Sequence, residues 1–225
     1  LGEAFHEYGV LTPRPSWAEQ WPDVWLEAVT IVLKDVLAQS GLNPKDVAAV
    51  AISGLYGGSG IPVDKAGEPV RPCMIWMDRR ARNETQWVKD NIPFDKIFSI
   101  TGNYVDSYYG FTKILWMKNN EPDLWKRTRQ FMTPKDYVIY KFTDIAATAY
   151  SSAGNIGGIF DIHKKGWSQE MSDALGIPLS LFPERITKSF DIVGKLNKKY
   201  AAATGLLEGT PIVAGGIDAP VAQFS

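Results

Sequence analysis

Residues 214–220 read AGGIDAP and include a side chain that could do chemistry, the carboxylate of Asp218. An apolar, strand-like run precedes them, and open α/β sheets bind ligands beyond the carboxyl ends of such strands. Gly215 and Gly216 carry no side chains that would block the approach to Asp218. Placed there, the carboxylate could contact a bound ligand. The residue could equally cap a helix that begins directly after it, so the sequence leaves both roles open.

Residues 75–80 read IWMDRR and place an aromatic ring beside charged groups. Trp76 emerges from an apolar run, and Asp78 and Arg80 follow at once. Proteins bind sugars with such a set, because aromatic rings cover the C–H faces while charged groups pair with the hydroxyls. The plain alternative is the end of a strand whose charges are solvated.

A glycine-rich stretch, residues 51–64 (AISGLYGGSGIPVD), has four glycines in seven positions. A phosphate-binding loop would open directly into a helix, whose N-terminal dipole favours negative charge. The lysine-containing form of such a loop would end in GKS or GKT. Here no such lysine follows, and IPVD predicts a strand. The stretch is therefore a turn, either an ordinary hairpin or a wall without side chains beside a small polar ligand.

Composition excludes several classes of protein. The 225 residues carry a net charge of −1, so nothing favours long-range attraction to nucleic acid or to an anionic membrane. No apolar run reaches membrane-spanning length. The two histidines, His6 and His163, lie far apart, and with one cysteine they make a zinc site improbable, so no metal site is predicted from protein ligands. The single Cys73 fits the reducing cytoplasm.

Patterns of apolar residues predict strands alternating with helices, which indicates an α/β domain with a mixed sheet. Predicted helices cover residues 22–41, 79–92, 111–119, 134–142 and 195–204, with a helix start after 218. Predicted strands lie near 3–10, at 47–52 (buried on both faces), in a meander over 61–78, within the alternating stretch 146–162, and at 211–214.

Both ends of the chain are expected to be cut. Leu1 lies in a strand-like segment, and Ser225 lies in the start of an apolar helix without a cap. A buried strand at 47–52 needs partners along both edges, and the sequence before it offers one strand. We therefore expect part of a longer protein.

Five sets of segments, taken in order, match the patterns of one family. PRPSWAEQWPDVW resembles P-x-P-G-W-x-E-Q-D-P-x-x-W, and AISG followed by IWMDRR resembles I-S-x-Q-x-x-G followed by W-x-D-x-R. YYGFTKILWMKNNEP resembles F-S-x-x-K-x-x-W-x-x-x-x-x-P, and FDIHKKGWSQEM resembles F-D-I-x-x-x-x-W. The last set, VGKL with TGLLEGTPIVAGGIDAPVA, is similar to the segment that holds a catalytic aspartate. Together they resemble the FGGY family of carbohydrate kinases, whose members phosphorylate glycerol, pentuloses and related polyols.

The resemblance implies a ribonuclease H-like (actin/hexokinase-like ATPase) fold, with a mixed sheet flanked by helices. Residues 1–225 would form the N-terminal, sugar-binding lobe of a two-lobe kinase. The phosphate-binding hairpin that precedes this region in the family, and the C-terminal nucleotide lobe, would lie outside the chain. The chain alone would then be inactive.

The resemblance also implies ATP-dependent phosphorylation of a sugar or polyol hydroxyl, with Mg²⁺. Asp218 matches the family's general base, and Gly215 and Gly216 would lie on the cofactor side. Candidate acceptor contacts are Trp76, Asp78, Arg80, Tyr56 and Tyr108.

Two departures bear on the acceptor. Tyr56 and Gly57 stand where glycerol kinases carry Arg-Glu, so glycerol is disfavoured. Xylulokinases carry Gln-Met-His-Gly where this chain has LYGG, which puts the histidine contact in doubt. A pentulose such as xylulose is the expected acceptor.

Two other classes compete with a kinase. A non-catalytic sugar-binding or regulatory module would keep the lobe but have no use for Asp218, and a structural actin-like subunit would need neither Asp218 nor the 75–80 segment in a ligand cleft. The eight tryptophans suit a dimer face as well as a core, so a homodimer is left open.

Overall fold

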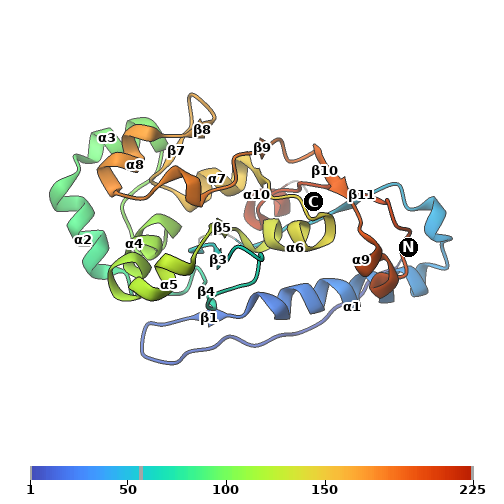
Figure 1. Cartoon of the computed structure of the whole chain (residues 1–225). Coiled ribbons are helices and arrows are strands. Elements are labelled where there is room, and N and C mark those ends of the chain that lie inside the picture. The colour runs from blue at the N-terminus through green and yellow to red at the C-terminus, as the bar shows by residue number, and fades with distance from the viewer. Residues whose placement is uncertain (1, 56–57, 224–225) are drawn as a thin grey trace.

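The computed structural model describes residues 2–55 and 58–223, which form an elongated α/β molecule (Figure 1). Its helices are α1 (Pro22–Ser40), α2 (Arg82–Asn91), α3 (Phe94–Thr101), α4 (Gly110–Asn120), α5 (Pro122–Arg127), α6 (Pro134–Thr143), α7 (Tyr150–Ile156), α8 (Gln169–Leu175), α9 (Lys198–Thr204) and α10 (Asp218–Ala222), with 3₁₀ turns η1 (Pro44–Asp46) and η2 (Leu179–Leu181). Its strands are β1 (Glu19–Gln20), β2 (Val50–Ala51), β3 (Ile61–Val63), β4 (Cys73–Met74), β5 (Gln130–Met132), β6 (Thr148–Ala149), β7 (Phe160–Asp161), β8 (Gly166–Trp167), β9 (Ile186–Thr187), β10 (Ile192–Lys195) and β11 (Pro211–Val213).

The long helix α1 has clear start and stop signals in the sequence. Pro22 occupies its first turn, where a missing N–H costs nothing, and Asp23 lies there beside the positive end of the helix dipole. Gly41 ends the helix in the left-handed conformation, with φ of 62°. Over the described residues, the structure contains no helix that is both long enough and apolar enough to cross a membrane.

A three-stranded sheet, ordered β10-β11-β2, positions the glycine-rich turn. β10 and β11 are antiparallel, whereas β11 and β2 are parallel, so the sheet is mixed as expected. The parallel pairing continues past both strands as a bridge between Gly54 and Ile217. The glycine-rich turn after β2 therefore lies beside the residue that precedes Asp218.

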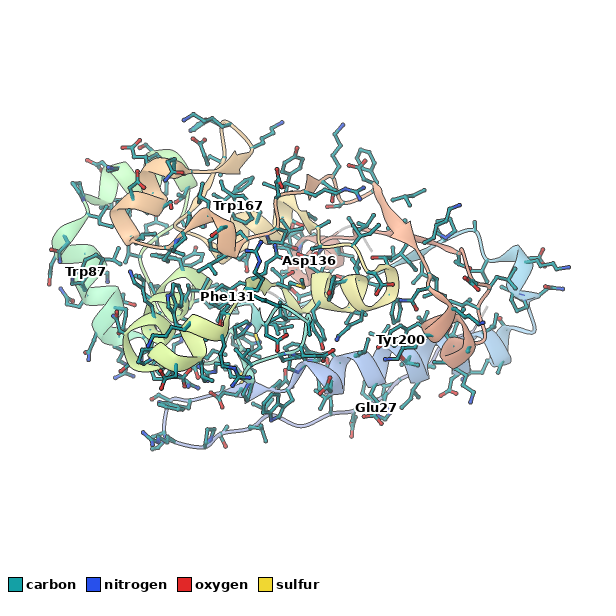
Figure 2. The ribbon with its side chains drawn as sticks, in the orientation of Figure 1. Glu27, Trp87, Phe131, Asp136, Trp167 and Tyr200 are labelled. Carbon is teal, nitrogen blue, oxygen red and sulfur yellow. The ribbon has the colours of Figure 1, made fainter. Side chains whose placement is uncertain are left out.

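The buried apolar residues form two clusters. One packs α1, α6 and α9 against the three-stranded sheet, and its members include Trp25, Phe142 and Ile212. The other lies among α2, α3, α4, α7 and α8, and its members include Phe111 and Phe131. Figure 2 shows Asp136, on α6, between the part with Phe131 and Trp167 and the part with Tyr200.

Several predicted elements were wrong in detail. The described residues before Leu11 form no strand, so the strand expected near 3–10 is missing. The stretch 146–162, read as alternating strands, contains α7 between β6 and β7. The 61–78 meander is correct only in its first turn, where Val63 forms an antiparallel bridge with Pro69, because β3 otherwise pairs with β5 and β4 pairs with β1. β2 is buried on one face, since Val50 is buried and Ala51 is exposed. For β3 and β4, partners distant in sequence decided the pairing.

Candidate active site

Glycines allow three segments to meet where β11 ends. Gly215 has φ of +64°, and a Cβ atom there would lie 1.9 Å from the carbonyl oxygen of Ile52. A Cβ atom on Gly54 would lie 2.8 Å from the Cβ atom of Lys135. Side chains at either position would push β11, β2 and α6 apart. The glycines thus fix the backbone that leads to Asp218.

Asp218 is the first residue of α10, whose N-cap is Ile217. Its backbone N–H donates to the Gly54 carbonyl over 2.9 Å, which ties the start of α10 to the glycine-rich turn. Its carboxylate is exposed and accepts a hydrogen bond of 2.8 Å from the Ala219 N–H. The side chain therefore supports the start of the helix and keeps oxygen lone pairs that other groups can reach. Its role as a base stays a prediction.

A cleft of about 270 Å³ opens beside this carboxylate; we call it the strand-tip cleft. Its walls come from α1, from the end of β2 and the turn through Leu55, from the start of α6, and from Asp218. Ser53, Lys135 and Asp218 supply polar groups among mostly apolar neighbours. Mostly apolar walls with a few convergent polar groups are typical of sites for small molecules.

Lys135 links α6 to the end of β11. Its buried ammonium donates to the Ala214 carbonyl over 2.8 Å and lies 2.5 Å from Asp136 Oδ1. The other Asp136 oxygen accepts hydrogen bonds of 2.7 Å from the hydroxyls of Thr133 and Thr148. Because each buried charge in this set has partners, the network can hold the strand end in place without the large cost of an unpaired charge.

Asp78 and Arg80 form a buried ion pair. Asp78 is 0% exposed, and its Oδ2 accepts from the Ala18 N–H over 2.7 Å and from Arg80 over 2.6 Å. Arg80 Nε donates to both carboxylate oxygens over 3.0 Å. The pairing leaves little of Asp78 for a ligand, and it joins the segment after β4 to the segment before β1.

A second layer surrounds that ion pair. Arg80 also lies 2.7 Å from Glu19, which in turn pairs with Arg71. The Arg80 guanidinium carbon lies 3.5 Å from the ring centroid of Trp17 and 4.9 Å from that of Trp116. Cation–π contacts of this kind gain strength in surroundings that exclude water. This network holds together segments far apart in the sequence.

Trp76 lies at the surface, and Tyr108 contacts an exposed ion pair. Trp76 is 47% exposed. Arg79 lies 2.5 Å from Asp106 Oδ1, which also accepts the Tyr108 N–H over 2.7 Å. The Arg79 guanidinium carbon is 5.7 Å from the Tyr108 ring centroid. The 75–80 segment and Tyr108 are thus neighbours, as their shared assignment to the acceptor requires.

Lys113 supports the Tyr108 turn from beneath. It is fully buried on α4, and its ammonium donates to the Tyr108 carbonyl over 2.6 Å. Burial lowers the pKa of Lys113 to about 7, while the nearby Asp78 charge acts in the opposite direction. Among the predicted acceptor contacts, Tyr56 lies outside the described residues.

The predicted site residues form two groups. Asp78, Arg80 and Tyr108 belong to the first, and Asp218 belongs to the second; of these residues, Asp218 alone is among the described residues that line the strand-tip cleft. Between the groups lies a small cavity, which we call the Ser152 cavity, bounded by the glycine-rich turn, the start of α6, α7 and Ile217. It shares Leu55 and Pro134 with the strand-tip cleft. The glycine-rich turn therefore forms a wall of both spaces.

The described residues could supply only a few of the ligands of a magnesium ion. Within residues 2–55 and 58–223, no three His, Cys, Asp or Glu side chains lie close enough together to hold a metal ion. Mg²⁺ is commonly bound through one or two carboxylates together with substrate phosphates and water. Asp218 could serve as such a carboxylate, and Gly215 and Gly216 leave the approach to it open.

Sequence reasoning missed the buried lysines and Ser152. Lys113 stands in FTKILWM and Lys135 in PKDYVIY, both on helices whose buried residues are mostly apolar. A lysine among apolar residues of a helix could have predicted a buried, paired charge, because lysine is rarely buried without a partner. Ser152 gave no comparable signal, since serine is common in every environment.

Comparisons with known proteins identify the family. The profile of the FGGY family of carbohydrate kinases, N-terminal domain, matches residues 1–225. The xylulose kinase of Staphylococcus xylosus is 32% identical over 210 residues, which are 93% of this chain and 42% of that protein. The glycerol kinase of Halothermothrix orenii is 31% identical over 191 residues, which are 82% of this chain and 38% of that protein. This chain belongs to the FGGY family of carbohydrate kinases, and it spans less than half the length of these relatives.

Solved structures with the same fold are also kinases. A ligand-bound xylulose kinase from Lactobacillus acidophilus matches with a TM-score of 0.89 at 22% identity, over 97% of this chain and 43% of that one. A gluconate kinase from the same organism matches with a TM-score of 0.88 at 23% identity, over 96% of this chain and 43% of that one. They confirm the expected actin-like ATPase fold.

Proposed function

We propose that the protein containing this chain transfers a phosphoryl group from ATP to a hydroxyl of a sugar or polyol. Family membership and the xylulose and glycerol kinase relatives support a carbohydrate acceptor. The observation that carries the proposal is the exposed carboxylate of Asp218, which lines a cleft at the end of a parallel strand pair.

Asp218 would act as the general base. The acceptor hydroxyl must lose its proton as it attacks phosphorus, and an oriented carboxylate contributes roughly 10²–10⁴-fold to such a step. The hydrogen bonds of Asp218 to Gly54 and Ala219 fix the helix start, while Lys135 holds the strand that leads to it. ATP with Mg²⁺ would supply the phosphoryl group and neutralise its charge.

The acceptor class is a pentulose such as xylulose, with glycerol disfavoured. Tyr56 and Gly57 stand where glycerol kinases carry Arg-Glu, which removes the charged pair that would fix glycerol hydroxyls. Of the predicted acceptor contacts Trp76, Asp78, Arg80 and Tyr108, we keep Trp76 and Tyr108 as direct contacts. The buried pairing of Asp78 with Arg80 supports a positioning role for both, whereas Trp76 can present its ring directly. We place the reaction in the cytoplasm, with a homodimer as one assembly to test.

The test is ATP consumption by the complete natural protein over a panel of ketopentoses, aldoses and polyols. We expect turnover with at least one ketopentose and little with glycerol. Asp218→Ala should lower kcat at least 100-fold while acceptor-dependent thermal stabilisation is retained. Turnover within about tenfold of the unchanged protein would refute the base assignment. Acceptor binding without any turnover would favour the non-catalytic sugar-binding module instead.

A further inference from the structure

The hydroxyl of Ser152 has no hydrogen-bond partner within the described residues. Ser152 is the third residue of α7 and is 0% exposed, and its Oγ is buried. Leaving a buried hydroxyl without a partner costs about 1–3 kcal/mol. Such a cost is tolerated where a ligand supplies the missing partner. The surroundings of Ser152 Oγ therefore indicate which ligand group could bind to it.

The Ser152 cavity is sized for one small group. The volume open to a water-sized group is about 10 Å³. That is close to the minimum that holds one water, and hence one hydroxyl group. The described residues that line it are all uncharged, and Asn155 is the other polar side chain that α7 contributes. A phosphate or carboxylate would find no cation there, so the cavity suits a neutral hydroxyl.

The position of the cavity connects the two groups of predicted site residues. Ile217, which precedes Asp218, forms one wall. Gly58 forms another, and a Cβ atom on it would lie 3.3 Å from the carbonyl oxygen of Met74, two residues before Trp76. A Cβ atom on Gly110, two residues after Tyr108, would lie 2.4 Å from the Gly58 carbonyl oxygen. The segments that lead to Trp76, Tyr108 and Asp218 therefore come together at the walls of this cavity.

We propose that Ser152 binds one hydroxyl group of the acceptor inside this cavity and so helps to select the acceptor. The inference rests on the proposed function and deepens it, because it assigns a residue to one hydroxyl of a neutral sugar or polyol. That hydroxyl is not the one phosphorylated, since the cavity has no room for a phosphoryl group. The occupied cavity would give Ser152 Oγ the partner that it lacks among the described residues.

The experiment measures KM for the accepted sugar and for each of its monodeoxy analogues, in the complete protein and in Ser152→Ala. We expect Ser152→Ala to raise KM for the full sugar about 3–10-fold, the worth of one neutral hydrogen bond. One deoxy analogue, which lacks the hydroxyl in question, should show the same KM with both proteins. The pairing of variant with analogue isolates a single contact.

Ser151→Ala is the matched control. Ser151 is the neighbouring residue on α7, and its Oγ is also buried with no partner in the described part of the chain, but it is not among the residues that line the cavity. We expect this variant to leave every KM unchanged. Without acceptor, both variants should melt at or slightly above the temperature of the unchanged protein, because each loses an unpaired polar group.

Three results would overturn the inference. A lower melting temperature for Ser152→Ala without acceptor would mean that the hydroxyl already has a structural partner. Equal KM increases for all analogues would mean a general distortion of the site, and no KM change would mean that the cavity holds water alone. If no sugar on the panel binds or turns over, the proposed function fails and this inference fails with it. If sugars turn over without this pattern, the Ser152 assignment fails alone.

Discussion

Two aspartates follow strands in this molecule, and their surroundings differ sharply. Asp78 comes after β4, is 0% exposed, and accepts hydrogen bonds from Ala18 and Arg80. Asp218 comes after β11, is exposed, and accepts a bond from the next residue, Ala219. A carboxylate can take a proton from a substrate only if a lone pair can be reached. The comparison therefore indicates a structural role for Asp78 and supports the proposed catalytic role of Asp218.

The difference in burial between Asp78 and Asp218 also predicts different contributions to the free energy of unfolding. Removing one partner of a buried ion pair leaves the other charge buried without that partner. An exposed carboxylate, in contrast, is solvated in both the folded and unfolded states. The four predictions below test this division, from the largest expected effect to the smallest.

Asp78→Ala should lower the free energy of unfolding by about 3–5 kcal/mol, because Arg80 would remain buried with Glu19 as its remaining carboxylate partner. Chemical denaturation measures the loss. Asp218→Ala is the control and should stay within about 0.5 kcal/mol of the unchanged protein. A stable Asp78→Ala protein with a raised acceptor KM would reverse the division and make Asp78 a direct acceptor contact.

Gly215→Ala should cost about 2–4 kcal/mol of stability, because it adds left-handed strain to overpacking. Its Cβ atom would lie 1.9 Å from the Ile52 carbonyl oxygen, so β11 must move and carry Asp218 with it. We expect kcat to fall as well, measured in the ATP-consumption assay. Gly216→Ala is the matched control, since its Cβ atom would meet side chains rather than backbone: Cγ2 of the exposed Val221 at 2.9 Å and Oγ of Ser189 at 3.8 Å. Equal losses in the two variants would contradict this account of the strand tip.

The strand tip could be predicted from sequence because its signals are local. An apolar run, two glycines and an acid lie within eight residues, and each has a direct physical meaning. Helix α1 was predictable for the same reason, from its proline start and its glycine stop. The general α/β class followed from such local patterns.

The buried ion pair could not be predicted, because its partners are distant in sequence. Asp78 accepts from Ala18, sixty residues earlier, and Arg80 packs on Trp17 and Trp116. Without those contacts, IWMDRR reads as a sugar-binding set or as a solvated strand end. Helix α7 was misread for a related reason: tertiary contacts override a weak local alternation. The Ser152 cavity that α7 helps to form therefore could not be predicted from the sequence.

The buried Lys113 predicts that stability depends on pH. Because the pKa of the buried ammonium is lowered to about 7, the folded state binds fewer protons than the unfolded state between that pH and about 10.4. Its contribution to stability therefore rises with pH, by about 1–2 kcal/mol from pH 6.5 to 8.5. The charges that face it are Asp78, Arg79 and Asp106, together with the Cys73 thiol, whose pKa burial raises to about 11, above this window.

Denaturation at pH 6.5, 7.5 and 8.5 tests this dependence. Lys113→Met should flatten the rise in the free energy of unfolding with pH. The stability of this variant relative to the unchanged protein should therefore be highest at pH 6.5. Lys126→Met is the control, because that side chain is 76% exposed and should leave the slope intact. If the free energy of unfolding changed equally with pH in all three proteins, Lys113 would stay charged throughout. Asp78 would then interact less exclusively with Arg80 than the geometry indicates.

Arg79→Ala should have the smallest effect, although Arg79 is adjacent to Arg80. Its ion pair with Asp106 measures 2.5 Å, but the two side chains are 40% and 54% exposed. Exposed pairs contribute about 0.2–1 kcal/mol and are screened by salt. A double-mutant cycle with Asp106→Ala should therefore give a coupling in that range that fades in 1 M salt. A coupling as large as that expected for Asp78 would show that hydrogen-bond geometry, rather than burial, separates the two regions.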